Sequence, residues 1–368
     1  MDFTKVSGHM ARKLQAILPT VAGSHGASPP EGVATVDLSI AENDLLRTVE
    51  PDHIITTAGA GNALDALLCS VCDEADRVLV AGPCWEGFGP YFLIHANAKP
   101  ITVTPSSPED AAQMSIVDAL QEAYHNDANP DRIRAVVLTN PNNPRGQCYA
   151  PDELRECLRF CHAHDLHLIS DEVYALSSFE SHAGLYPFVS ILSLLEGDAM
   201  ASRVHVIWSM SKDFGCSGIR MGCIISQANP ALRFAAGLAS YWQVSSLTSV
   251  MAIALLNSVE LPMLLQRNSE ALGVSYRLLT EGLDRLGIQY VPANYGLFVF
   301  AKLVQDCRTA QEEIGIVNEL ARSGLIVAQG QKFSPGREVF GWVRITFSTS
   351  TSKIEQALRV LELFRGQV

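Results

Sequence analysis

Short apolar stretches of strand length alternate with helical patterns between residues 53 and 226, and this alternation constrains the fold more than any other feature of the chain. A strand that is followed by a helix and then by another strand usually pairs in parallel with it, because the chain crosses back over the sheet. Such a sheet is covered by helices on both faces, so its strands are apolar throughout. The alternation therefore predicts an α/β fold with a mostly parallel central sheet covered by helices. The strand-like stretches are 53–59, 77–82, 99–105, 133–140, 166–174, 204–212 and 219–226, and helical patterns include 61–73, 108–125 and 151–164.

The pattern changes after a helical region at about 229–286. Strand-like stretches at 296–303 and 343–348 now accompany a helix at 308–323 and a last helix from about residue 351, which predicts a smaller α+β domain. A chain of 368 residues is also too long for one small core and suits a large and a small domain. We expect an N-terminal segment at 1–45 that joins the small domain, a large cofactor-binding domain at 46–265 and the C-terminal small domain at 266–368.

The composition indicates a soluble globular protein whose partner is a small molecule. Apolar residues form 48% of the chain and charged residues 18%, which suits a large buried core. The formal net charge of −12 repels phosphate backbones and anionic lipid headgroups, so nucleic acids and membranes are poor partners. No apolar stretch approaches the roughly 20 residues that span a bilayer, and the N-terminus lacks an apolar signal region.

The nine cysteines, an odd number scattered from Cys69 to Cys307, do not form the dense framework of a small secreted protein. They favour reduced thiols and a cytoplasmic location. Cys69 and Cys72 form a C-x-x-C, but they lie in an apolar stretch with helical spacing, which favours core packing over redox chemistry. Cys157 and Cys161 lie near histidines, yet paired C-x-x-C units are missing, so we expect no metal site.

Polar residues follow several predicted strands at their carboxyl ends, where open parallel sheets bind ligands. The first strand ends in AGAGN, in which Ala60, Gly61 and Asn62 open a helix with free backbone N–H groups and the positive end of its dipole. This arrangement predicts an anion site, and phosphate is its natural occupant. A dinucleotide fingerprint would need a glycine where Leu64 stands. Two hydroxyls and a cation would complete the phosphate site, from Ser209, Ser211 and Arg220.

Three further motifs occur in a fixed order along the chain. NPNNPRG lies at 140–146, D-x-x-Y runs from Asp171 to Tyr174, and S-x-S-K ends at Lys212, eight residues before Arg220. In this order and spacing, the motifs resemble those of class I and II aminotransferases of fold type I, which depend on pyridoxal 5'-phosphate (PLP). The resemblance covers most of the chain. It implies PLP as the cofactor, an amino acid as the substrate and a homodimer as the assembly.

The resemblance also implies a role for each residue at the cofactor. Lys212 would carry PLP as a Schiff base, Asp171 would pair with the pyridine nitrogen, and Tyr174 with Asn143 would contact the 3'-oxygen. Trp85, in GPCWEGF, matches the aromatic residue that stacks on the cofactor ring. The residues of the first helix and of the phosphate site above would hold the phosphate.

The chemistry explains why these residue types are needed. A protonated pyridine nitrogen lets PLP accept the electrons that develop at the substrate Cα, and a buried carboxylate such as Asp171 keeps that proton in place. Once the substrate has displaced the amine of Lys212, this amine lies beside Cα and can act as general base and acid. We therefore expect Lys212, Asp171 and Tyr174 to be the catalytic residues.

The substrate side of the site is implied by three further matches. Arg344, in GWVRITFS, matches the arginine that holds the substrate α-carboxylate, and Asn143 belongs to the same site. The string S-I-A-E-N at 39–43 and the string S-K-D-F-G at the lysine resemble the branch of 1-aminocyclopropane-1-carboxylate (ACC) synthase-like proteins. Ala41 and Glu42 would then lie near the substrate side chain.

Members of that branch break a C–S bond by elimination, while relatives transaminate, and the shared motifs do not separate the two reactions. We expect a lyase that acts on a sulfur-bearing amino acid. An aminotransferase that passes an amino group to a 2-oxo acid is the first alternative. A non-catalytic binding module with the PLP fold is the second, but intact Lys212, Asp171, Tyr174 and Arg220 argue against it.

Two departures from the family pattern stand out. Arg145 occupies a position in NPNNPRG where a small or apolar residue is common, so it is either exposed or a ligand for an anionic substrate tail. Only fifteen residues separate Glu42 from Ala58, whereas the family has several tens more, including a tyrosine that reaches the partner subunit's cofactor phosphate. Either the protein has lost this stretch, or the printed sequence omits it.

Overall fold

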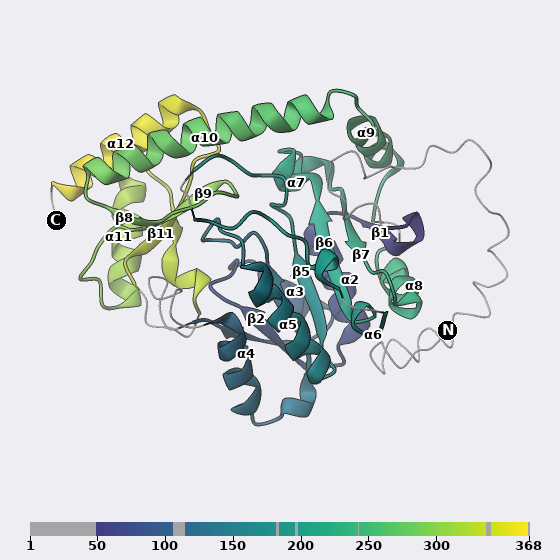
Figure 1. Ribbon diagram of the computed structural model, residues 1–368. Helices are drawn as coiled ribbons and strands as arrows, with labels where there is room; N and C mark the ends of the chain where they lie inside the picture. The colour runs from purple at the N-terminus through teal and green to yellow at the C-terminus, as the bar shows by residue number, and fades with distance from the viewer. Residues whose placement is uncertain are drawn as a thin grey trace.

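The structure is a computed structural model that describes residues 49–105, 115–181, 184–195, 198–241, 243–335 and 340–366. The predicted N-terminal segment, with Ala41 and Glu42, lies outside the described residues, as does the first part of the helix predicted at 108–125. The described residues form two sheets with their covering helices (Figure 1).

The larger sheet has seven strands in the order β1-β7-β6-β5-β4-β2-β3. Neighbouring strands pair in parallel from β6 to β3, whereas β7 is antiparallel to both β6 and β1. This order confirms the mostly parallel sheet expected from the alternating pattern. The strands are β1 (Ile54–Thr57), β2 (Arg77–Ala81), β3 (Lys99–Val103), β4 (Ile133–Thr139), β5 (His167–Asp171), β6 (Val204–Ser209) and β7 (Gly222–Ile225).

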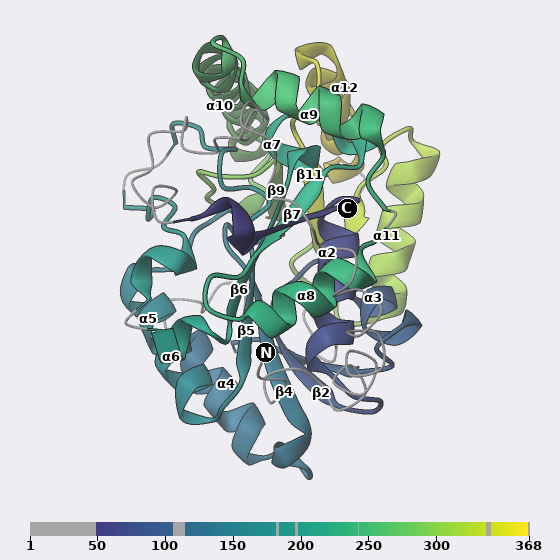
Figure 2. The ribbon, with the colours of Figure 1, turned by 90° about the vertical axis from the view of Figure 1, so that its right-hand side faces the viewer.

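Helices cover both faces of this sheet (Figure 2). Alternate residues of β4 explain why, because successive side chains of a strand point to opposite faces. Val136 and Leu138 pack beneath α4 and α5, while Ala135 and Val137 pack beneath α2, α3 and α8. The helices are α2 (Ala60–Val71), α3 (Phe88–Ile94), α4 (Ile116–His125), α5 (Pro151–Ala163), α6 (Asp198–Ala201), α7 (Met210–Asp213) and α8 (Pro230–Ala239).

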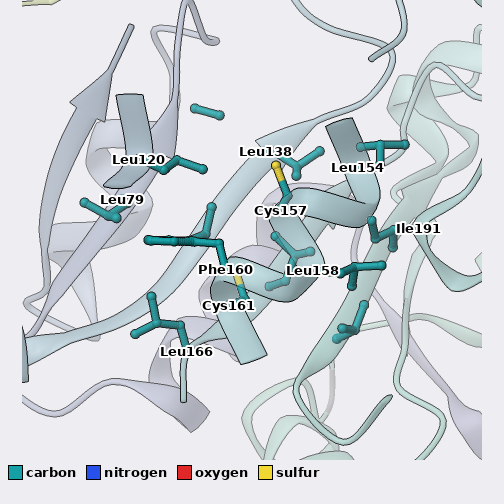
Figure 3. Packing of buried hydrophobic residues seen from close by; sticks show 14 of the residues in the cluster. Leu79, Leu120, Leu138, Leu154, Cys157, Leu158, Phe160, Cys161, Leu166 and Ile191 are labelled. Carbon is teal, nitrogen blue, oxygen red and sulfur yellow. The ribbon is translucent and has the colours of Figure 1, made fainter. Parts of the chain in front are cut away.

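Helix α5 shows how the pattern of apolar residues places a helix on the sheet. Leu154, Cys157, Leu158 and Cys161 follow the i, i+3, i+4, i+7 spacing of one helix face, and all are buried against the sheet (Figure 3). Pro151 occupies the first turn, where its missing N–H costs no hydrogen bond. The two cysteines are thus core residues, and burial raises the pKa of the Cys161 thiol.

The smaller sheet has four antiparallel strands in the order β10-β11-β9-β8. Helices α10, α11 and α12 pack on it around a separate core that includes Tyr276, Val299 and Phe347. This arrangement confirms the predicted smaller α+β domain. Its elements are α10 (Leu261–Arg285), β8 (Gln289–Val291), β9 (Phe298–Lys302), α11 (Ala310–Arg322), β10 (Ala328–Gln329), β11 (Trp342–Thr346) and α12 (Thr351–Arg365).

Helix α10 connects the two parts of the molecule. It runs from α9 (Ser246–Leu256), beside the large sheet, to α12 on the small domain (Figure 1), so the boundary predicted at 265/266 falls inside one helix. A small cluster of Val173, Tyr174 and Phe298 joins the large sheet to the small one. Among the described helices none alone is long and apolar enough to cross a membrane; α9 and α10, which meet at 85°, satisfy that test of length and composition only as a bent pair.

The packing in Figure 3 generates a stability prediction. Leu154→Ala should lower the free energy of unfolding by about 2–5 kcal/mol, because Leu154 is fully buried and its removal leaves a cavity between α5 and the sheet. Leu363→Ala serves as the matched control, since Leu363 is 70% exposed on α12 and its loss should change stability by less than about 0.5 kcal/mol. Urea titration of both variants checks the prediction, and equal losses would contradict it.

Candidate active site

A cavity of about 330 Å³ opens at the carboxyl ends of the parallel strands, between the large and the small sheet. Thr139, Asp171 and Ser209 end the neighbouring strands β4, β5 and β6, so the sheet order alone lines them up along one edge. The structure brings together nearly all of the described residues that the sequence predicted. Those lining the cavity are Ala60, Gly61, Trp85, Asn143, Asp171, Tyr174, Ser209, Ser211, Lys212, Arg220 and Arg344.

One end of the cavity is built for an anion. Gly59 precedes α2 with φ of 91°, a left-handed conformation that favours glycine, and it leaves the first N–H groups of α2 without helical partners. The guanidinium of Arg220 lies against this turn, because a Cβ on Gly59 would come within 2.5 Å of its Nη2 atom. The same guanidinium donates to the carbonyls of Ala58 at 2.7 Å and Ser217 at 2.8 Å. These bonds fix a positive charge beside the start of the helix.

Arg220 adopts a left-handed backbone conformation, with φ of 58°, directly after the short 3-10 turn η6 (Ser217–Ile219). Such a conformation is rare for a residue with a side chain and recurs at functional sites. Two residues later, Gly222 allows β7 to pass close to the α2 turn, since a Cβ there would lie 2.8 Å from the carbonyl carbon of Gly59. The local backbone conformation therefore places the Arg220 guanidinium beside the start of α2, at some cost in backbone strain.

Asn62 and the two serines contribute in different ways. The side chain of Asn62 does not line the cavity; its Oδ1 atom accepts a hydrogen bond from the Ala58 N–H at 3.0 Å and so shapes the turn. Ser209 is buried and caps α7, because its hydroxyl oxygen accepts from the Ser211 N–H at 3.4 Å. This cap begins the helical turn that carries Lys212.

Asp171 lies at the bottom of the cavity as a buried carboxyl group without a full set of partners. Its Oδ1 atom has no hydrogen-bond partner among the described residues. Burial raises the pKa of Asp171 to about 7, while the Val173 N–H and the charge of Lys212 oppose this shift. A cationic N–H donor in the cavity would satisfy this oxygen and restore the charged form.

Lys212 projects from α7 into the cavity. Partial burial and the positive charge of Arg344 lower its pKa, whereas Asp171 acts in the opposite direction. A lowered pKa increases the fraction of neutral amine, which is the form that attacks a carbonyl carbon or takes up a proton. The side chain therefore suits both roles that the sequence implied.

Arg344 comes from β11 of the small sheet and completes the site from the opposite side. Its Nη1 atom donates to Oδ1 of Asn143 at 2.9 Å, and its guanidinium lies between the rings of Phe298 and Phe333, 5.0 and 4.9 Å from their centres. Its Nε atom has no hydrogen-bond partner among the described residues. A carboxylate could thus be bound by a positioned cation and the amide of Asn143.

These features fit PLP. The unpartnered Asp171 oxygen meets the need of a pyridine N–H, the start of α2 with Arg220 meets the need of a phosphate, and Lys212 lies where it can reach the aldehyde. The ring of Trp85 borders the same cavity and can stack on an aromatic cofactor. Tyr174 is buried beside Phe298, with ring centres 5.4 Å apart, and burial raises its pKa.

Comparison with known proteins decides the family. The family described as "Aminotransferase class I and II" matches residues 25–361. The chain belongs to this family. Class I and II aminotransferases are PLP-dependent enzymes, and so is this one.

Several relatives show which members of the class I and II aminotransferases this chain is similar to. "Probable aminotransferase aclI" of Aspergillus oryzae is 41% identical over 323 residues, which cover 87% of this chain and 76% of the relative. "1-aminocyclopropane-1-carboxylate synthase-like protein 1" of Bos taurus is 29% identical, over 87% of this chain and 64% of the relative. These matches confirm the resemblance to ACC synthase-like proteins.

Solved structures confirm the fold of this aminotransferase-family protein. An aromatic aminotransferase from Pyrococcus horikoshii superposes with a TM-score of 0.75 at 22% identity, over 98% of this chain and 92% of that chain. An aspartate aminotransferase from Thermus thermophilus with maleate gives a TM-score of 0.74 at 23% identity, over 98% of this chain and 88% of that chain. Fold type I is therefore the architecture of the large and small sheets.

One alignment is longer than this chain. "Probable aminotransferase tcpI" of Claviceps purpurea matches 96% of this chain at 29% identity, but the alignment runs over 405 residues. This length exceeds the 368 residues of the whole chain, so the relative carries internal residues that this aminotransferase-family chain lacks.

Sequence reasoning missed several residues of the site. Thr139 could have been found as the last residue of β4 at the carboxyl edge, and its buried hydroxyl has no hydrogen-bond partner among the described residues. Tyr91, on α3, and Phe298, on β9, carry no motif and reach the cavity only through the tertiary fold. Val173, Ser217, Leu297 and Thr346 also line the cavity.

The structure supports neither of the two positions that the sequence left open for Arg145. This side chain does not line the cavity, and burial lowers its pKa. Its Nη2 atom donates to Oε1 of Gln147 at 3.0 Å. Arg145 is therefore neither an exposed charge nor, among the described residues, a ligand at the substrate end of the cavity.

The position of Lys212 leads to a chemical prediction. Borohydride treatment of the PLP-loaded protein should fix the cofactor irreversibly on Lys212, because its amine has a lowered pKa and opens into the cavity. Mass spectrometry of proteolytic peptides would locate the adduct, and Lys212→Arg should give none. An adduct on another lysine, such as the exposed Lys332, would refute the assignment.

Asp171 leads to a pH prediction. Its pKa is about 7 when folded without cofactor and near the ordinary value of 3.8 when unfolded, so the stability linked to its proton is present below about pH 4 and lost as the pH rises through 7. Asp171→Asn cannot ionise. Melting temperatures of the PLP-free proteins from pH 5 to 8 should therefore fall faster for the unmodified protein than for the variant. With PLP bound, this excess fall should shrink, and parallel curves without PLP would contradict the account.

Proposed function

We propose that the protein eliminates a sulfur leaving group from a sulfur-bearing amino acid, a C–S lyase reaction at the β- or γ-carbon. The S-K-D-F-G string at Lys212 and the relatives named as ACC synthases and ACC synthase-like proteins support this choice within the PLP-dependent class. The observation that carries it is the small number of cations in the cavity.

Each cation that lines the cavity already has a place in the proposed site. Arg220 is held at the start of α2, Lys212 faces the cofactor position, and Arg344 is bound to Asn143. Among the described residues, no fourth cation lines the cavity to bind the second carboxylate of a dicarboxylic substrate or oxo acid. Glu86 follows Trp85 outside the cavity, where it pairs with Lys332 at 3.6 Å. The shortage of cations within the cavity therefore favours an uncharged substrate side chain over an acidic one.

The residues of the site divide the work of elimination. When bound, PLP supplies the electron sink for the charge that develops at Cα. Arg344 and Asn143 hold the α-carboxylate and so fix the orientation of the Cα–H bond. The neutral amine of Lys212 removes the Cα proton, and the sulfur departs with the electrons of the C–S bond. Asp171 stabilises the charge on the ring nitrogen throughout.

Transfer of an amino group to a 2-oxo acid is the second candidate function. The fungal relatives at 41% and 39% identity are named as probable aminotransferases, and an amine that takes up the Cα proton can also return it at another atom. Both reactions begin with the same proton abstraction. They differ in where the electrons go next, and the cofactor form left after one turnover records that difference.

We also propose that the enzyme works as a cytoplasmic homodimer. Helix α9 has no distinct polar face and leaves Leu247, Val250 and Met251 more than half exposed, which suits burial against a second copy. All nine cysteines are free thiols, in keeping with a reducing compartment.

Single-turnover product analysis tests the proposed reaction. A cysteine thioether incubated with a stoichiometric amount of holoenzyme should release a thiol and leave the cofactor in its pyridoxal form. The analogue with a methylene in place of sulfur serves as the control substrate, and S-adenosylmethionine, whose sulfonium group is on the γ-carbon, tests elimination at that carbon. Conversion of the cofactor to pyridoxamine phosphate without sulfur release would sink the lyase proposal and support the aminotransferase. Lys212→Ala should lose either activity by several orders of magnitude.

A further inference from the structure

Tyr91 is a cavity residue to which neither motif nor family resemblance assigned a function. It lies on α3, half-buried, and its ring borders that of Trp85 with centres 6.2 Å apart and planes inclined by 35°. Its hydroxyl has no hydrogen-bond partner among the described residues. A phenol that opens into a polar cavity without a partner is available to a ligand.

The hydroxyl of Tyr91 lies over the start of α2. A Cβ built on Gly61 would come within 2.4 Å of the hydroxyl oxygen and 2.6 Å of the carbon that bears it. Any residue larger than glycine would therefore displace the ring. Gly61 is the second residue of α2, and its N–H lies among the first turn of donors that have no helical acceptor. The phenol and these N–H groups thus converge on one place.

Arg220 leaves room for another donor at that place. Its guanidinium already donates to two backbone carbonyls, of Ala58 and Ser217, so part of its hydrogen-bonding capacity is used to hold the loop. A phosphate dianion presents three oxygens that each accept more than one hydrogen bond. Backbone N–H groups, Arg220 and the serine hydroxyls supply some of these bonds, and a phenol O–H can supply another.

We propose that Tyr91 is a cofactor-binding residue whose hydroxyl donates to the phosphate of PLP at the start of α2. Its ring continues the aromatic wall begun by Trp85, so the same side chain contacts the phosphate end while its neighbour covers the ring end. Gly61 is required because the Tyr91 ring occupies the space of a side chain there. The proposal concerns cofactor binding alone and does not depend on which reaction follows.

Binding of PLP and of pyridoxal separates a phosphate ligand from a simple wall of the cavity. Both compounds react with Lys212 through the same aldehyde, but only PLP carries the phosphate. Tyr91→Phe should raise the dissociation constant of PLP by about tenfold to a hundredfold, the range for a hydrogen bond to a charged group. The same variant should leave pyridoxal binding unchanged. Inorganic phosphate should compete with PLP more weakly on the variant than on the unmodified protein.

A matched variant and a measurement of folding serve as controls for the binding experiment. Tyr186→Phe removes a phenol that is 51% exposed and does not line the cavity, and it should bind both compounds normally. The melting temperature of each PLP-free variant reports on folding. Equal weakening of PLP and pyridoxal by Tyr91→Phe would mean that the hydroxyl supports the cavity without contacting the phosphate. No effect on PLP would mean that the hydroxyl makes no such bond. Either result would overturn the proposal.

Discussion

The site depends on one buried acid, Asp171, at the carboxyl end of β5. Its neighbours in the sheet are β4 and β6, so Thr139 and Ser209 end on either side of it at the same edge. A carboxyl group in this position is costly when charged, and among the described residues the Val173 N–H and the charge of Lys212 offset part of the cost. The sheet thus holds a group that becomes fully satisfied only when a cationic ring nitrogen is present. The predicted role of Asp171 at the cofactor ring would use this same unpartnered oxygen.

A second buried acid, Asp213, connects two of the segments that lie around Asp171. It accepts hydrogen bonds from Ser177 Oγ at 2.6 Å and Trp208 Nε1 at 2.9 Å, and burial raises its pKa to about 7. Ser177 follows Tyr174 on the segment that leaves β5, whereas Asp213 directly follows Lys212. This network therefore fixes the loop of the buried tyrosine against the helix of the lysine. Asp213, the aspartate in S-K-D-F-G, therefore has a structural role that could not be predicted from its position in this string.

The sequence predicted the features that depend on the spacing of apolar residues and on the residues at the ends of strands. Burial on both faces requires β4 to be mostly apolar, so the parallel sheet could be recognised. Of the site residues, Asp171 ends β5 and Lys212 lies three residues after the end of β6. Contacts made across the fold could not be predicted, because the direction of a side chain on a helix is set by packing. Tyr91 reaches the α2 turn in this way, and Arg145 turns away from the cavity although its motif lies beside it. Asn62 stands in the predicted turn, yet its side chain bonds to the backbone.

Residues of both domains form the predicted substrate end of the site. Substrate binding there would therefore depend on the relative position of the two domains. Arg344 comes from the small sheet, while its partner Asn143 follows β4 of the large sheet. Phe298 lies against the guanidinium of Arg344 and meets Tyr174 edge to face, so the predicted carboxylate ligand and the buried tyrosine share one aromatic contact. A cation between two rings is held in place without losing its free N–H groups to other acceptors. Although the chain carries a net charge of −12, a substrate carboxylate would therefore meet a positioned positive charge at the junction of the two sheets.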